Sequence, residues 1–202
     1  MTLLPFEQYT NFIQMAVTLF FSNWVWLQAR RTTRETAVHI FAAGLFSFFL
    51  GDLFWTAHLL VKGVAAAAFC PADVAWIGLF IWFFGAMRLL RPENAPRPWW
   101  VWALTALVPA NYVVWVTGMQ GDLLTNALWG IVMTLLMWQT ACCLAGKEKR
   151  LRPFACCVLA FLLLELVLFL SWGAAYAILD LLVTVSVVAM SLTLIKGVRH
   201  DG

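Results

Sequence analysis

The 202-residue sequence has little charge: Asp, Glu, Lys and Arg make up only 11% of it, while hydrophobic residues make up 63%. A soluble globular domain carries about a quarter charged residues, so this composition excludes an ordinary water-soluble domain. The sequence contains no P-loop, G-x-S-x-G or H-E-x-x-H motif, no Asn-x-Ser/Thr acceptor and no internal repeat. We expect no cleaved signal peptide, because no small-residue cleavage site follows the first apolar run.

Seven apolar stretches are present, and a helix that crosses a membrane needs about 20 such residues. The sequence therefore predicts an all-α fold, a polytopic transmembrane bundle that forms one integral membrane domain over residues 1–202, with no soluble domain. The expected helices cover residues 9–29, 36–61, 72–90, 99–117, 121–145, 153–171 and 175–196.

The basic residues are distributed unevenly over the links between these helices. Numbering the links alternately places all thirteen Lys and Arg residues except Lys62 on one side. Basic residues concentrate in cytoplasmic loops. The pattern predicts an N-terminus outside and a C-terminus in the cytoplasm, in a bacterial cytoplasmic membrane. The net charge of +3 thus reflects topology and indicates a lipid bilayer as partner, with no nucleic acid.

The second stretch carries Ala43, Ser47 and Gly51 at four-residue spacing. Small residues at this spacing let a neighbouring backbone approach closely in a membrane. We expect this face to be a packing seam.

Three acidic residues, Asp52, Glu165 and Asp180, lie inside apolar stretches, with no Lys or Arg at comparable depth. A charged group at mid-membrane costs roughly 2.5–3.5 kcal/mol. These acids must therefore be protonated, partnered, or neutralised by a bound cation. Glu165 and Asp180 both lie about 11 Å below the turn that joins the last two helices, so they could share one proton.

Other polar and aromatic side chains fall at the same outer level when residues are counted from the helix ends. We expect them to form a polar cavity that opens outward, with His58, Asp73 and Trp76 at its rim. Each also has a structural explanation: buried acids can hold helices together, Asp73 and Asp122 begin helices where the dipole favours them, and His58 lies near an interface. The expected ligand-binding residues are Asp52, Trp55, His58, Asp73, Trp76, Asn111, Asn126, Glu165, Tyr176 and Asp180.

Cofactor and metal sites are not expected. A retinal protein needs a lysine within the last helix, whereas Lys196 lies at its cytoplasmic end. His39 and His58 are about 28 Å apart on one helix, and no other span holds a histidine that could share a haem. The adjacent pairs 142–143 and 156–157 are cysteines that point about 100° apart on a helix, which is a poor geometry for metal ligation.

Two adjoining segments carry a resemblance: GDLFW at residues 51–55 ends one expected helix, and PADVAWIG at 71–78 begins the next. They resemble the multi-helix membrane sensory regions that precede diguanylate cyclase or kinase domains in bacteria, over about 40 of the 202 residues. The resemblance implies sensory-region positions for Asp52, Asp73 and Trp76. Because the sequence shows no cytoplasmic output domain, the resemblance also implies a membrane or cytoplasmic signalling partner. The Gly51-Asp52 pair and the size are, more faintly, similar to small membrane lysoplasmalogenases.

The leading functional hypothesis is an outward-facing sensing or binding module for a small cationic or protonatable ligand. The alternatives are a proton-coupled small-molecule transporter, an intramembrane lipid-cleaving enzyme, and an accessory membrane protein without a ligand site. No residue is assigned a catalytic role, so an enzyme is not favoured.

Overall fold

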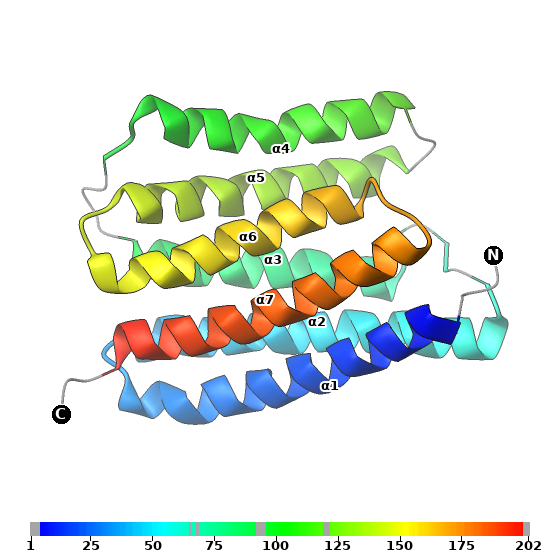
Figure 1. The fold of residues 1–202 in the computed structure, drawn as a ribbon, viewed down its shortest axis with the longest axis horizontal. Helices are drawn as coiled ribbons and strands as arrows, with labels where there is room; N and C mark the ends of the chain where they lie inside the picture. The colour runs from blue at the N-terminus through cyan, green and yellow to red at the C-terminus, as the bar shows by residue number, and fades with distance from the viewer. Residues whose placement is uncertain (1–4, 65, 68, 92–95, 119–121, 200–202) are drawn as a thin grey trace.

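The computed structural model describes residues 5–64, 66–67, 69–91, 96–118 and 122–199, and these form a bundle of seven α-helices (Figure 1). The prediction of an all-α fold is confirmed, and the observed helix ends differ from the expected ones by four residues or fewer. The helices are α1 (Pro5–Gln28), α2 (Glu35–Lys62), α3 (Pro71–Leu90), α4 (Trp99–Gly118), α5 (Leu123–Ala145), α6 (Arg152–Leu168) and α7 (Ala174–Val198), with short 3-10 turns η1 (Ala29–Arg31) and η2 (Lys149–Leu151).

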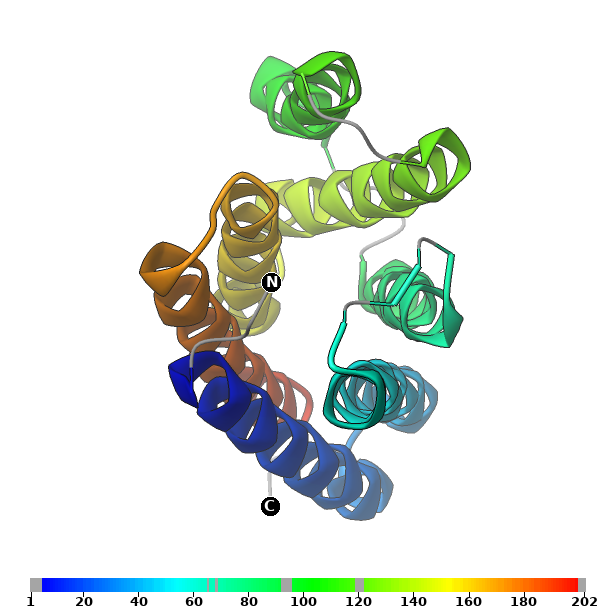
Figure 2. The same cartoon turned by 90° about the vertical axis from the view of Figure 1, so that its right-hand side faces the viewer.

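Six of the helices form a closed ring when the bundle is viewed along its length (Figure 2). Each helix packs on the next in the order α1, α2, α3, α5, α6, α7, and α7 packs back on α1. α4 stands outside the ring and packs on α5. The interior of the ring is therefore enclosed by six helices, in which α3 and α5 run parallel, as do α7 and α1, and the other neighbours run antiparallel.

Five helices, α2, α3, α5, α7 and α6 with its preceding turn η2, are long and apolar enough to cross a membrane. α1 has 24 residues but is less apolar, and the apolar part of α4 is shorter. Large apolar side chains such as Leu27, Val61 and Val185 are exposed on the outside of the bundle. Lipid is the solvent that accepts such a surface, and the chain is a multi-pass integral membrane protein.

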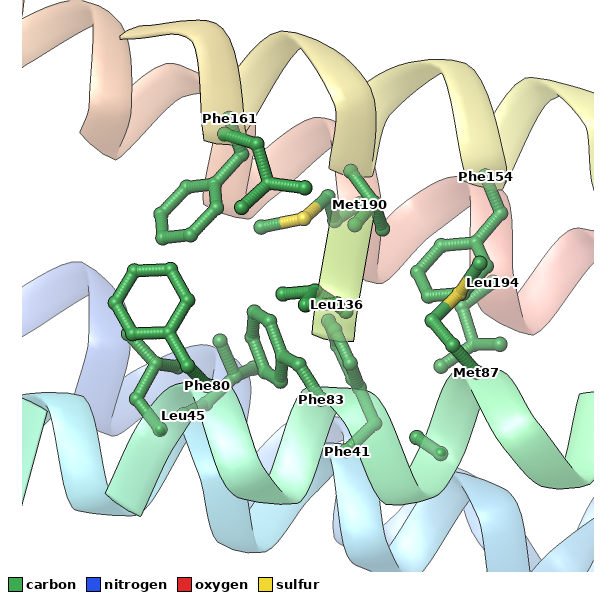
Figure 3. Packing of buried hydrophobic residues seen from close by; sticks show 14 of the residues in the cluster. Phe41, Leu45, Phe80, Phe83, Met87, Leu136, Phe154, Phe161, Met190 and Leu194 are labelled. Carbon is green, nitrogen blue, oxygen red and sulfur yellow. The ribbon is translucent and has the colours of Figure 1, made fainter. Parts of the chain in front are cut away.

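All basic residues except Lys62 lie at one end of the bundle, at the left of Figure 1, which we call the basic end. The interior of this half is filled by aromatic and aliphatic side chains (Figure 3). Phe41 stacks on Phe83 with ring centroids 4.6 Å apart and meets the edge of Phe154 at 5.4 Å. Because lipid is as apolar as these side chains, close packing stabilises this core more than exclusion of water does.

The seam between α2 and α3 is built from small residues. The Ser47 hydroxyl donates a hydrogen bond of 2.6 Å to the Ala75 carbonyl oxygen across it. A Cβ atom at Gly51 would lie 2.5 Å from the Trp76 indole, and one at Gly44 would lie 2.7 Å from the Phe83 ring. Two of the three expected seam positions, 47 and 51, thus face α3, and Gly44 takes the place expected for its neighbour at position 43.

Candidate functional site

The ring encloses a cavity of about 160 Å³ in the half of the bundle away from the basic end. One water molecule needs about 10–15 Å³ of such space, so the cavity has room for several waters or one small ligand. All six ring helices contribute side chains to its wall. The lining residues are Asn11, Gln14, Phe48, Asp52, Trp55, Asp73, Trp76, Leu79, Phe80, Trp129, Glu165, Leu168, Phe169, Tyr176 and Asp180.

The three intramembrane acids all line this cavity, from three different helices. Asp52 comes from α2, Glu165 from α6 and Asp180 from α7, and each side chain is more than nine-tenths buried. Asp52 is within electrostatic range of both other carboxyls, and Glu165 is within range of Asp180. Counting residues from the helix ends gave a common depth for these acids, and the structure shows that they also face one space.

Three tryptophans surround the Asp52 side of the cavity. The Trp76 indole N–H donates a hydrogen bond of 3.0 Å to Asp52 Oδ1. The Trp76 ring lies 5.8 Å from Trp55 and 6.5 Å from Trp129, measured between centroids. Gly51 makes this arrangement sterically feasible, because any side chain there would occupy the place of the indole. The wall beside Asp52 is therefore aromatic, with one carboxylate oxygen fixed by a hydrogen bond.

A buried polar stripe on α1 reaches the cavity at Gln14, and the sequence prediction missed it. Thr10, Gln14, Thr18 and Ser22 recur at four-residue spacing and are all buried. Thr10 and Gln14 lie beside the Asp180 carboxyl, and the Ser22 hydroxyl donates a hydrogen bond to α2. The signal was present in the sequence, because polar residues at this spacing in an apolar helix mark one inward face.

Several polar atoms of the cavity wall have no hydrogen-bond partner among the residues that the structure describes. They are Gln14 Nε2, Asp52 Oδ2 and Asp180 Oδ2, each shielded by its surroundings. The Gln14 amide lies near Asp180 but outside hydrogen-bonding geometry. An unsatisfied buried polar group costs about 1–3 kcal/mol, and three such groups around one cavity indicate that water or a ligand completes the site.

The outer part of the cavity is formed by Asp73 and Tyr176, from the first turns of α3 and α7. The Asp73 carboxylate accepts a hydrogen bond of 2.9 Å from the Cys70 backbone N–H, so it also caps α3. Asp122 is the N-cap residue of α5, accepts a hydrogen bond from the Thr125 backbone N–H, and does not line the cavity. Hydrogen bonds from the hydroxyl and the backbone N–H of Thr125 lower the pKa of Asp122.

Three of the expected ligand-binding residues lie elsewhere. His58 is beside Phe54, with ring centroids 6.0 Å apart, and does not line the cavity. Asn126 lines a separate apolar groove between α4 and α5, and Asn111 is half-buried on α4, outside the ring. These residues have the expected depth, but they sit on helix faces, or on a helix, that the ring does not enclose.

Among the described residues, the charge of the lining has one sign: four lining residues are acidic and none is Lys, Arg or His. Within the part of the chain that the structure describes, no three His, Cys, Asp or Glu side chains gather as a metal-binding group. The carboxyls are spread over the wall of the cavity, on α2, α3, α6 and α7.

Comparison with known proteins adds no relative: the chain matches no protein-family model, no curated protein and no solved structure.

Proposed function

We propose that all seven helices cross the bacterial cytoplasmic membrane, with the basic end in the cytoplasm and the cavity in the outer half. The concentration of Lys and Arg at one end supports this orientation. α1 and α4 can cross the membrane although they are less apolar or have a shorter apolar part, because neighbouring helices cover part of their surface. The polar stripe of α1 is buried toward the ring interior, and α4 packs along α5.

We propose that the cavity binds a small cationic or protonatable ligand and that the protein is a sensing or binding module. The observation that carries this proposal is the wall of the cavity: Asp52, Glu165 and Asp180 are buried around one space, and none of the described lining residues is basic. Buried negative charge without a partner is costly in a membrane. A bound cation removes that cost, so the cavity favours positive over neutral or negative ligands.

The aromatic wall supports the same class of ligand. Trp55, Trp76 and Trp129 lie next to the carboxyls. A cation over the face of a tryptophan gains about 2 kcal/mol when it is desolvated. Carboxylates together with indole rings are well suited to an organic ammonium group.

Binding is favoured over transport by the packing beneath the cavity. Leu79 and Phe80 close its inner side, and Phe83, Phe154 and Met190 behind them are fully buried. The basic half of the ring is thus a filled core (Figure 3). A site that is blocked on the inner side is suited to detecting a ligand outside, and the resemblance of residues 51–55 and 71–78 to sensory regions implies a signalling partner for the output.

A ligand panel on the purified protein tests the proposal. Thermal unfolding in detergent or nanodiscs is measured with small amines and with carboxylates of equal size. We expect only the amines to raise the melting temperature, and Asp52→Asn or Asp180→Asn to remove the effect. Glu35→Gln is the matched control, because Glu35 is exposed at the basic end. Equal shifts by amines in the wild type and in both Asp variants would reject the proposed site.

Orientation is tested separately by cysteine labelling in a cysteine-free background. A membrane-impermeant thiol reagent added to intact cells should label Lys62→Cys and not Lys147→Cys. The reverse pattern would place the cavity on the cytoplasmic side.

A further inference from the structure

We infer that the ligand carries an oxygen hydrogen-bond acceptor in addition to its cationic nitrogen, as a small amino alcohol or amino amide does. This inference rests on the proposed function and specifies the ligand class. It comes from the kinds of unpartnered atoms in the wall, which differ from one side of the cavity to another.

Two of the unpartnered atoms are acceptors. Asp52 Oδ2 on α2 and Asp180 Oδ2 on α7 accept no hydrogen bond from any residue that the structure describes. These helices are the two neighbours of α1 in the ring (Figure 2), so the two carboxyls flank the face of α1 that looks inward. An ammonium group offers several N–H donors and no acceptor, and it therefore matches the two carboxylates.

The third unpartnered atom is a donor, and an ammonium group cannot satisfy it. Gln14 Nε2 on α1 makes no hydrogen bond to a described residue, although the Asp180 carboxyl lies near it, and the Gln14 side chain is only 3% exposed. Asn11, on the same helix, adds a second amide to this wall. A simple alkylamine would leave the Gln14 amide unpaired, at the cost of a buried unsatisfied group.

A hydroxyl or carbonyl oxygen on the ligand would complete the set, because both accept from an amide N–H. The remaining wall, formed by Trp55, Trp76 and Trp129, is aromatic and suits the carbon atoms next to the charge. The wall of the cavity thus combines carboxylate, amide and aromatic groups. A ligand with a positive nitrogen, a short carbon chain and an oxygen matches all three.

The test compares 2-aminoethanol with n-propylamine, which have the same number of heavy atoms and differ by one hydroxyl in place of a methyl group. Calorimetric titration is carried out on the full chain, wild type and Gln14→Met. Because one hydrogen bond is involved, we expect the wild type to bind 2-aminoethanol about tenfold more tightly than propylamine. Gln14→Met, which keeps the side-chain length, should bind both amines equally.

The outcomes separate the two proposals. If both amines bind equally to the wild type and Asp52→Asn abolishes both, the cation site stands and the inferred acceptor is wrong. If neither amine binds to the wild type, both proposals fail. If Gln14→Met does not fold, the comparison of the two amines in the wild type alone decides whether the ligand carries an oxygen acceptor. If Gln14→Met folds and still prefers 2-aminoethanol to propylamine, the role given to Gln14 is overturned.

Discussion

The Trp76 indole reaches Asp52 across the α2–α3 seam, with a hydrogen bond of 3.0 Å between Nε1 and Oδ1. The contact depends on Gly51, the residue before the carboxylate, because a Cβ there would lie 2.5 Å from the indole ring. α2 thus supplies both the acid, Asp52, and the space at Gly51 for the indole that orients it. α3 supplies that indole, which donates the hydrogen bond. The second carboxylate oxygen of Asp52 remains available to the cavity.

Gly51→Ala should therefore displace Trp76 and free Asp52. Overpacking in a tight seam costs about 1–3 kcal/mol, so we expect a lower melting temperature and weaker binding of amines. Gly85→Ala is the control: the new methyl group would meet Ile40 at an ordinary 3.5 Å, and the change should leave amine binding intact. Tryptophan fluorescence reports the displacement of the indole, and thermal unfolding with and without amine reports the melting temperature and the binding. An unchanged amine affinity in Gly51→Ala would show that the indole does not orient the acid.

Trp55→Leu should weaken amine binding without unfolding the protein, because Trp55 is half-buried at the cavity. Loss of a desolvated cation–π contact of about 1–2 kcal/mol corresponds to about tenfold in affinity. The matched change Trp99→Leu removes an indole that is 79% exposed and should have no effect on binding. Calorimetry distinguishes the two variants, and equal affinities would remove Trp55 from the site.

Much of the fold was predictable because the helices are long apolar stretches separated by basic or proline-containing links. The depth of Asp52, Glu165 and Asp180 followed from counting residues to the nearest turn. The direction in which each side chain faces did not follow, since the apolar residues of helices such as α4 and α7 are spread around the helix and mark no preferred inner face.

This missing direction explains why Asn111, an expected ligand-binding residue, lies away from the cavity. Asn111 shares the depth of the acids, but α4 lies outside the ring, and nothing in its apolar sequence marks it as peripheral. Gln14 was overlooked, although the spacing of Thr10, Gln14, Thr18 and Ser22 does mark a face. The ring order, in which α3 packs on α5 rather than α4, requires tertiary structure.

His58 and Asn126 provide a negative test of the site. Neither lines the cavity, and Asn126 faces the groove between α4 and α5 instead. We expect His58→Gln and Asn126→Ala to bind amines with wild-type affinity in the calorimetric assay. A loss of affinity comparable to that of Asp180→Asn in either variant would mean that the binding site extends beyond the cavity described above.

The cap of α5 should give a specific pH dependence. Because the folded-state pKa of Asp122 is lowered below its ordinary value of 3.8, its stabilising contribution is complete above that value and is lost as the pH falls through the lower, folded pKa. Asp122→Asn retains a good cap and does not titrate. The stability difference between wild type and variant should be constant above about pH 5 and should shrink in more acidic solution. A difference that does not change between these ranges would contradict the assignment.

The central claim is that buried carboxylates without basic partners hold a cation in the outer half of the ring. The most direct measurement is a calorimetric titration of wild type and of the double variant Asp52→Asn/Asp180→Asn with 2-aminoethanol at neutral pH. The account predicts saturable one-to-one binding to the wild type and none to the folded double variant. Binding of equal affinity to both proteins, or to neither, would contradict it.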